Sequence, residues 1–397
     1  MTEKATMAQP AHVAMETTVN SPDLRADQDD GGRHGPPADL AHHAESYWKA
    51  LSGRSERAAL DVVLAALDEG APLERVLLDV IAAGQRRIGT EWAANRISVA
   101  QEHAATAISE RVVAALSLHR PRPANAVARG RITVACADGE WHALPARLLA
   151  EILAARGWQV DYLGAHVPGP HLIAHLHQTG PDAVALSSLL SARLPAVHAV
   201  ITACQAAGVP VLAGGAAFGP DGRYARLLGA DAWAPDALAA SEVLAGPIPA
   251  PRGPHQAVDD LPHLADQEYT MIERLRPKLV ADAMQQLAKR VPAMASYTPQ
   301  QLHHTAEDLA HIAEYVSCAV YVNDPDLFTS FVRWTAEILA ARNVPLRALT
   351  SGLDVLKDQL HDFPRATGMI DAALFDLADP ADFAQSTDPA DPAGREQ

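Results

Sequence analysis

The sequence has few cysteines, no long apolar run and a deficit of basic residues. Its 3 cysteines lie far apart in the chain, which is no disulfide framework and indicates a reducing cytoplasm. No apolar run approaches the ~20 residues of a membrane span, and the N-terminus lacks the basic-then-apolar pattern of a signal peptide. A net charge of −16 argues against a nucleic-acid partner, because phosphate binding needs clustered Lys and Arg.

What the sequence does contain is enough apolar material for several packed cores. Hydrophobic residues make up 48% of the 397-residue chain, and this length suggests two to three domains. Both ends are polar or Pro-rich without periodicity, so we expect them to be disordered. The predicted divisions are a disordered N-terminus (1–37), a four-helix bundle (38–122), an α/β domain (128–247), an all-α domain (260–364) and a disordered acidic tail (377–397).

Helical periodicity dominates the regions before and after the α/β domain. Ser55 and Ser98 each precede an apolar-periodic stretch, as helix N-caps do. Leu60, Val63, Leu64 and Leu67 form one apolar stripe. The expected helices are Asp39–Leu51, Ser55–Glu69, Pro72–Ala93 and Ser98–Leu118 in the bundle, and Glu268–Arg290, Thr298–Val322, Asp324–Arg342 and Pro345–His361 in the all-α domain.

The middle of the chain alternates short β-branched runs with helical stretches of ~10–15 residues, which predicts parallel βαβ units. Strands are expected near 131–136, 158–163, 182–187, 209–213 and 230–233. We predict a flavodoxin-like, doubly wound sheet, in which ligands bind at the carboxyl ends of the strands.

The loop after the first of these strands carries the strongest chemical signal. Ile132 to Cys136 is a buried strand, the turn Asp138-Gly139-Glu140 follows it, and His142 then precedes an apolar helix. Glu140 can accept the proton of one imidazole nitrogen and leave the other nitrogen free. A carboxylate behind a histidine fixes its tautomer and raises its basicity, which is the usual arrangement around a metal-binding His.

The ends of two further strands carry short motifs whose order along the chain is informative. Ser187-Ser-Leu189 closes the third strand and Gly214-Gly215 closes the fourth. With His142, this order resembles the cobalamin-binding signature Asp-x-His-x-x-Gly, Ser-x-Leu, Gly-Gly of methionine synthase and its relatives. From Pro145 to Ser187 there are 41 intervening residues, as in that family.

The resemblance covers about residues 131–244 and implies a cobalamin site. His142 would be the lower axial ligand of cobalt, and the nucleotide tail would enter a slot beside the glycines. The implied cofactor-binding residues are Asp138, Glu140, His142, Ser187, Leu189, Gly214 and Gly215. Two positions depart from the signature: Glu140 replaces Asp, and Pro145 replaces the first Gly, although Pro is tolerated at a helix start.

The third and fourth helices of the bundle carry Trp92, nine residues, then Glu102-His103. Taken alone, these are a boundary tryptophan and a solvated Glu-His pair. Before a cobalamin domain, they resemble the helical cap of adenosylcobalamin-dependent photoreceptors. That resemblance implies that Trp92 packs against the upper ligand, that Glu102 hydrogen-bonds the adenosyl group, and that His103 takes the upper position after light. Methyltransferase caps instead present apolar side chains, so the polar pair favours the photoreceptor.

Two helices of the all-α domain present polar and aromatic residues on single faces, because spacings of 3 and 4 share a face. Aromatic walls with a few polar groups are typical of a cofactor pocket. The residues are His304, Asp308, His311 and Tyr315, then Phe328, Phe331 and Trp334, which Tyr297, His303 and Arg333 can join. A dimerisation bundle or a polar seam between helices explains the same pattern.

The order of cap, cobalamin domain and all-α, globin-like domain resembles the photocobilins, whose last domain binds biliverdin. The resemblance implies that Asp308 or His311 contacts the pyrrole nitrogens and that Arg333 or His303 holds the propionates. Cys318 is a point for covalent attachment by this resemblance, but its apolar neighbours favour a buried structural thiol.

These patterns predict a cytoplasmic light sensor that uses adenosylcobalamin and biliverdin, forms a homo-oligomer and acts on an unidentified signalling partner. No nucleophile–base set or phosphate loop is present, so we expect no catalysis of its own. A corrinoid methyl carrier of a methyltransferase system is the first alternative. A haem or oxygen sensor, with His304 or His311 on iron, is the second.

Overall fold

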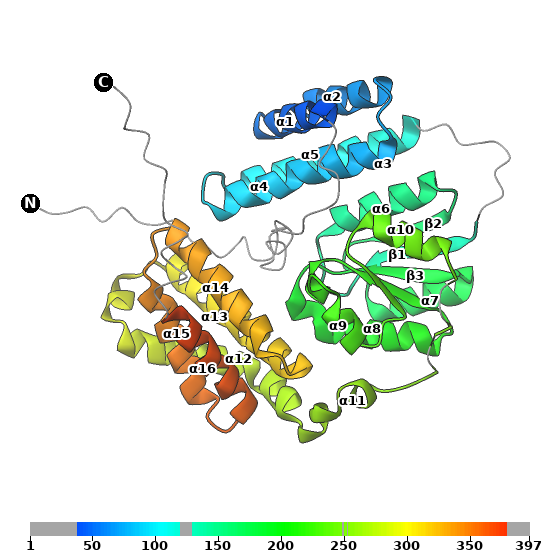
Figure 1. The fold of residues 1–397 in the computed structure, drawn as a ribbon. Helices are drawn as coiled ribbons and strands as arrows, with labels where there is room; N and C mark the ends of the chain where they lie inside the picture. Colours follow the sequence, from blue (N-terminus) through cyan, green and yellow to red (C-terminus); the bar gives the residue numbers. More distant parts are fainter. Residues whose placement is uncertain (1–37, 120–128, 248–249, 252, 379–397) are drawn as a thin grey trace, which may run out of the picture.

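The computed structural model describes residues 38–119, 129–247, 250–251 and 253–378. They form an N-terminal helical bundle (38–119), an α/β domain (129–247) and a C-terminal helical domain (257–377). Figure 1 shows the bundle above the α/β domain and the C-terminal helices to one side. The disorder predicted for residues 1–37 lies outside the described residues. The disorder predicted for 377–397 is wrong at its first residue, because Leu377 is the last residue of the helix Pro364–Leu377, and residues 379–397 lie outside the described residues.

The N-terminal bundle has the four predicted helices. They are α1 (Ala38–Ser52), α2 (Glu56–Asp68), a continuous helix made of α3 (Leu73–Arg75), the π-helical η4 (Val76–Ala82) and α4 (Ala83–Ala93), and finally α5 (Val99–His119). Both predicted N-caps are present. Ser55 accepts a hydrogen bond from the amide of Ala58 at 3.2 Å, and Ser98 exchanges hydrogen bonds with Gln101 in a capping box. The π-helical segment was not predicted.

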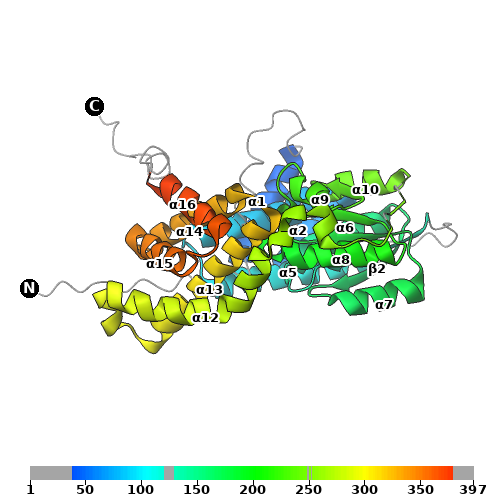
Figure 2. The ribbon, with the colours of Figure 1, turned by 90° about the horizontal axis from the view of Figure 1, so that it is seen from below.

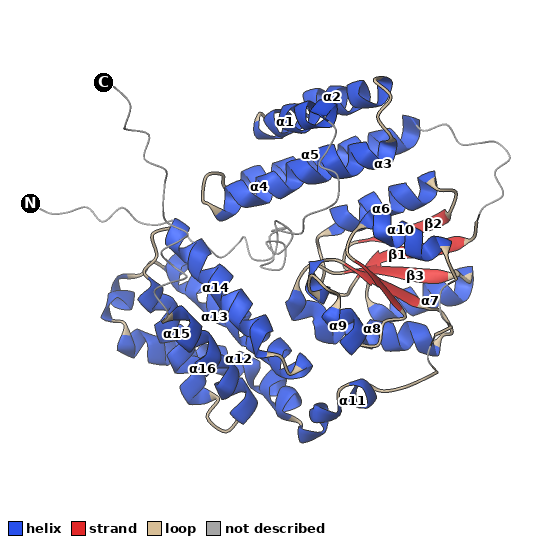
Figure 3. Cartoon of the chain, in the orientation of Figure 1, coloured by secondary structure: helices blue, strands red, loops and turns tan. Residues whose placement is uncertain are grey.

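The α/β domain has the predicted parallel sheet, in the flavodoxin order β2-β1-β3-β4-β5. The strands are β1 (Arg131–Cys136), β2 (Gln159–Gly164), β3 (Ala183–Ser187), β4 (Val211–Gly214) and β5 (Ala232–Ala234). Helices α6 (Ala143–Ala155) and α10 (Ala237–Ala245) cover one face, and α7 (Gly169–Thr179), α8 (Leu194–Ala206) and α9 (Arg223–Leu227) lie on the other, as Figure 3 shows.

The alternation of side chains along β1 explains why helices cover both faces. Ile132, Val134 and Cys136 join the core under α6 and α10, whereas Ala135 and Ala137 join the core on the α8 side. A parallel sheet buried on both faces leaves only its strand ends accessible. The strand ends are therefore where this domain can hold a ligand.

The C-terminal helical domain contains two α-helices that we did not predict, the short α11 (Ala257–Asp260) and the longer α16 (Pro364–Leu377). Its elements are α11 (Ala257–Asp260), η7 (Pro262–Asp266), α12 (Glu268–Arg290), η8 (Pro292–Ser296), α13 (Pro299–Val322), α14 (Pro325–Ala341), α15 (Leu346–Gln359) and α16 (Pro364–Leu377). Residues 365–376 were left unassigned, yet Ala366, Met369, Ile370, Ala373 and Leu377 give α16 a buried face. Proline at its first position and this spacing were the signals missed.

The three parts pack against one another. Leu144, Leu148 and Ile152 of α6 belong to the apolar core of the N-terminal bundle. On the opposite side, α13 contacts α8 and η5 (Ser191–Arg193), and one apolar cluster runs through both domains. Figure 2 shows the C-terminal helices and the α/β domain side by side. Within the described residues, none of the helices combines the length and apolar character that crossing a bilayer requires.

Gly84 marks a close helix approach that gives a stability prediction. A Cβ at Gly84 would lie 2.7 Å from Cδ1 of Tyr47, whose ring is fully buried and whose hydroxyl is 2.9 Å from Ser109 Oγ. We expect Gly84→Ala to lower the free energy of unfolding by about 1–3 kcal/mol. Gly368→Ala in α16 meets no atom within 4 Å and should raise it by about 0.4–1 kcal/mol. Urea unfolding measures both, and a stabilised Gly84→Ala variant would contradict this packing.

Candidate functional site

His142 lies at the start of α6, on the loop that follows β1, and is almost buried. Its Nδ1 is 2.5 Å from Oε1 of Glu140, and its amide donates to the same oxygen at 2.9 Å. The predicted contact between Glu140 and His142 is therefore present. Because a carboxylate oxygen only accepts, Nδ1 carries the proton.

The second ring nitrogen of His142 is ready to bind a ligand. Nε2 is shielded from solvent and has no hydrogen-bond partner among the described residues. With the proton on Nδ1, Nε2 presents a lone pair, and a buried polar atom without a partner is costly. This nitrogen could therefore serve as a ligand to a metal ion.

Glu140 connects the loops after β1 and β3, which the sequence did not predict. Its Oε2 accepts hydrogen bonds from the amides of Leu189 (2.7 Å) and Leu190 (3.1 Å) and from the hydroxyl of Ser188 (3.3 Å). Burial alone raises the pKa of Glu140, but hydrogen bonds and charge from His142, with the Leu189 amide, outweigh burial and bring the pKa to about 2. The carboxylate is therefore ionised at neutral pH, and it orients the histidine.

Two cavities meet at this loop. The strand-end cavity, of about 110 Å³, lies between the ends of β3, β4 and β5 and the helices α6 and α10. The cap cavity, of about 170 Å³, lies between α5 and the loop that holds His142. Pro145, the third residue of α6, lines both cavities. The position at which this sequence departs from the cobalamin-binding signature thus borders both cavities.

The predicted residues Ser187, Gly214 and Gly215 line the strand-end cavity. Gly215 has φ +106°, and a Cβ there would lie 2.2 Å from the carbonyl oxygen of Ser188. Only glycine fits this close approach of two strand ends. A Cβ at Gly214 would meet nothing closer than the carbonyl oxygen of Ala234, at 3.5 Å. Gly214 therefore keeps the cavity wide, whereas Gly215 is required by the backbone itself.

Glu102 and His103 face His142 across the cap cavity, as all three residues line it. Glu102 is buried; its Oε1 accepts a hydrogen bond from Thr106 at 2.9 Å, and its Oε2 is 2.8 Å from Nδ1 of His103. The His103 side chain is 47% exposed. The pair on α5 repeats the pair on the loop: in each, a glutamate holds Nδ1 and leaves Nε2 available.

Trp92, which we predicted to pack against an upper ligand, lies at the contact between the N-terminal bundle and the C-terminal domain. It does not belong to the residues that line the cap cavity. Its ring is buried beneath the guanidinium of Arg342, 4.8 Å from the ring centroid. Arg342 also donates to the carbonyl oxygens of Trp92 (3.4 Å) and Ala93 (3.3 Å), and burial lowers the pKa of Arg342. Arg342 ends α14, and nothing in the sequence indicated that it contacts the N-terminal bundle.

Other residues near His142 complete the loop. Trp141 is exposed, lines the cap cavity and stacks on His166 with ring centroids 4.7 Å apart. Asp138 lies 3.3 Å from Nδ1 of His166, and its contact is therefore with the loop after β2. Sequence reasoning missed Trp141, although an exposed tryptophan beside a ligand-type histidine was a usable signal.

The predicted aromatic residues of the C-terminal domain lie together. Tyr315 stacks on Phe331 with centroids 3.7 Å apart, and Phe328 and Trp334 lie 6.3 and 6.5 Å from Phe331. His304 is also buried, with Nδ1 3.3 Å from Glu307. Asp308, His311 and Tyr297 are half-buried.

Arg333 and His303 each contact an acidic side chain. The guanidinium of Arg333 is 2.5 Å from Asp376 of the unpredicted helix α16, and exposed His303 is 3.1 Å from Glu307. Cys318 is buried, and its thiol lies 2.9 Å from the carbonyl oxygen of Ser191. Burial also raises the pKa of Cys318, so the interpretation as a structural thiol fits the observed environment.

Comparisons with known proteins agree with the two upstream parts of this geometry. Two family models, each described as a B12 binding domain, match residues 130–242 and 43–117. The HTH-type transcriptional repressor CarA of Myxococcus xanthus is 32% identical over 180 residues, which cover 43% of this chain and 57% of the repressor. The chain therefore spans a little over half the length of this relative.

Solved structures of corrinoid proteins are also similar. The monomethylamine corrinoid protein of Methanosarcina barkeri is 19% identical, with a TM-score of 0.46 over 51% of this chain and 97% of that one. A cobalamin-binding protein from Desulfitobacterium hafniense DCB-2 is 20% identical, with a TM-score of 0.29 over 51% and 97%. The methanol:cobalamin methyltransferase complex MtaBC of Methanosarcina barkeri is 15% identical, with a TM-score of 0.29 over 57% and 90%.

The position of Glu140 gives a binding prediction. Glu140→Ala removes the partner of His142 and leaves the amides of Leu189 and Leu190 without their acceptor. We expect cobalamin affinity to fall by about 10–100-fold, as for other residues that orient a metal ligand. Asp138→Asn, on the same loop but paired with His166, should bind within about threefold of the unaltered chain. Absorbance titration measures both, and equal affinities for the two variants would contradict the role of Glu140.

The two matched ranges correspond to the N-terminal bundle, α1 to α5, and to the α/β domain from β1 to α10. The loop histidine with a free nitrogen, the glycine-lined cavity and the matched ranges lead to the same ligand. The chain contains cobalamin-binding (B12-binding) domains and is related to the repressor CarA.

Proposed function

We propose that this chain is a light sensor that holds adenosylcobalamin between the α/β domain and the N-terminal bundle, with a bilin chromophore in the C-terminal domain. The observation that carries the proposal is the buried carboxylate of Glu102, with His103 beside it, opposite His142 across one cavity. A cavity with an ionisable pair on its upper wall suits a polar upper ligand.

The lower face would be built by the loop after β1. His142 would bind cobalt through Nε2, because Glu140 holds the other nitrogen. Pro145 lies between the two cavities, so a nucleotide tail would pass it into the strand-end cavity beside Gly214. These roles match those that the cobalamin-binding signature assigns.

The upper face would be built by α5. When bound, adenosylcobalamin would supply a cobalt–carbon bond that light cleaves. Glu102, fixed by Thr106 and His103, would accept a hydrogen bond from the adenosyl group. His103 has its Nδ1 against Glu102 and a half-exposed ring. It is therefore oriented to offer Nε2 as a second axial ligand once the upper position is free.

The size of the cap cavity argues for movement of the bundle. At about 170 Å³ it is smaller than the ~300–1,000 Å³ pockets that hold drug-sized ligands, and cobalamin is larger than a drug. Binding therefore requires α5 to move away from the loop of His142. Since Trp92 is held by Arg342, such a movement would reach α14 of the C-terminal domain. The upper ligand can thus bias the packing of two domains.

The bilin part of the proposal is supported by one face of α13. His304, His311 and Tyr315 share that face, and Tyr315 stacks on Phe331 of α14. Buried aromatic rings with a few polar neighbours are the usual lining of a chromophore pocket. Asp308 or His311 would contact the pyrrole nitrogens. Arg333 would hold a propionate only after releasing Asp376.

Illumination of the cobalamin-loaded chain tests the proposal. We expect purified protein, loaded with adenosylcobalamin in the dark, to change both its absorption spectrum and its gel-filtration volume after green light. Biliverdin added to the same sample should give a protein-bound red absorption band. An unchanged spectrum and volume would overturn the light-sensor proposal, and methyl transfer from a methylated donor to the bound cobalt would favour a methyl carrier.

Histidine variants assign the two axial roles. We expect His142→Ala to lower cobalamin affinity at least ~10-fold, because it removes a metal ligand. His103→Ala should bind in the dark like the unaltered chain but give a different spectrum after light. His171→Ala, an exposed histidine at the start of α7, should match the unaltered chain in both states. A His103→Ala spectrum identical to the unaltered one after light would exclude His103 as the second ligand.

A further inference from the structure

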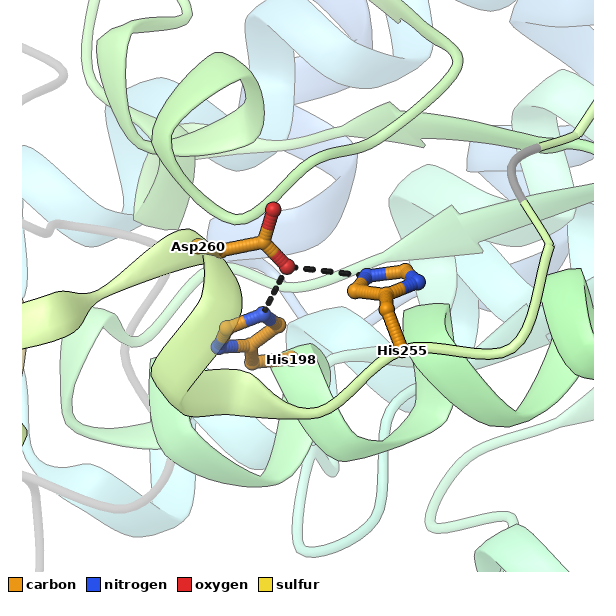
Figure 4. Close-up of side chains that lie close together, drawn as sticks. All are labelled: His198, His255 and Asp260. Atoms are coloured by element: carbon orange, nitrogen blue, oxygen red, sulfur yellow. Dashed lines mark hydrogen bonds and ion pairs between the residues drawn. The ribbon is translucent and has the colours of Figure 1, made fainter.

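Three side chains from separate segments meet where the α/β domain joins the C-terminal domain. His198 lies on α8, His255 lies after the Pro-rich connection 246–254, and Asp260 ends α11. Figure 4 shows the carboxylate of Asp260 between the two rings. One ligand atom from each residue lies within 4.8 Å of the other two. None of the three residues lines either of the two cavities described above.

The distances suit a small metal ion. Oδ2 of Asp260 lies 2.8 Å from Nε2 of His255 and 3.2 Å from Nε2 of His198. Ligands of tetrahedral zinc, at about 2.0–2.1 Å from the ion, lie roughly 3.4 Å apart. Small side-chain shifts therefore bring the three atoms to coordination distance. Neutral imidazole with carboxylate is a ligand set that Zn²⁺ accepts.

The proton positions of His255 point to a cation. Its Nδ1 lies 3.1 Å from the carbonyl oxygen of Gly253, which only accepts, so Nδ1 carries the proton. Nε2 of the neutral ring then presents a lone pair to the carboxylate of Asp260. That nitrogen is shielded from solvent and, among the described residues, has no hydrogen bond of acceptable geometry. Two electron-rich atoms 2.8 Å apart need a positive charge between them.

His198 also has one ring nitrogen beside a polar neighbour and the other beside Asp260. Its side chain is fully buried, and its Nδ1 is 2.8 Å from the hydroxyl of Tyr321 on α13. Histidines that bind metals usually donate their other N–H to a neighbouring acceptor, as Tyr321 and Gly253 allow here.

We propose that His198, His255 and Asp260 form a site for one Zn²⁺ ion, which fixes the segment 253–260 to α8. With three protein ligands, the ion would keep its fourth position for a water molecule, and it would be distinct from the metal of the proposed cobalamin site. Because Tyr321 contacts His198, the ion also orders the contact between α8 and α13. The competing arrangement is a protonated His255 that shares Asp260 with His198 and binds no metal.

Metal analysis of the full chain, prepared without a polyhistidine tag and without cobalamin, tests this site. After dialysis against zinc and then buffer, we expect about one zinc ion per chain, and chelator treatment should lower the melting temperature reversibly. His255→Ala and Asp260→Asn should each weaken zinc binding at least ~10-fold and abolish the chelator effect. His171→Ala should leave zinc content and melting temperature unchanged.

Two results would overturn the site. One is a zinc-free chain whose melting temperature does not respond to zinc or chelator, which would identify the shared-proton arrangement. The other is full zinc retention in both His255→Ala and Asp260→Asn, which would place the ion elsewhere. Because the measurement uses cobalamin-free protein in the dark, it does not depend on the light-sensor proposal.

Discussion

The conformation of the loop after β1 depends on the buried carboxylate of Glu140. A charged group removed from water is costly unless it is fully hydrogen-bonded. Here five donors from two loops compensate that cost: the amide and ring of His142, the hydroxyl of Ser188, and the amides of Leu189 and Leu190. The Glu140 side chain thus fixes the tautomer of His142, the conformation of the loop after β1 and the distance between the ends of β1 and β3.

Much of this arrangement was predictable because its signals are local. β1 matches its predicted bounds, and the other four strands lie within about two residues of theirs, because β-branched runs alternate with turns and helices. The parallel order then placed His142, Ser187 and Gly214 at one edge of the sheet, since the carboxyl ends of parallel strands meet there.

What the sequence did not reveal are contacts between distant segments. Arg342 contacts Trp92, which lies 250 positions earlier in the sequence. His198 contacts Asp260, which lies 62 positions later. No periodicity encodes such pairs, because each residue looks ordinary in its own helix. Arg333 shows the same limit. Its ion-pair partner Asp376 lies on α16, which we did not predict, so nothing in the sequence indicated that the guanidinium already has an acidic partner.

The contact of Arg342 with Trp92 closes a ring. The N-terminal bundle packs on α6, the α/β domain packs on α13, and α14 returns to the bundle through this arginine. Because each of the three parts contacts both of the others, one interface cannot open without a change at the other two. If cobalamin binding moves the bundle as proposed, thermodynamic reciprocity requires that cobalamin and a molecule displacing Arg342 would change each other's affinity by one common factor. The N-terminal bundle and the C-terminal domain are therefore joined by a direct contact as well as through the α/β domain.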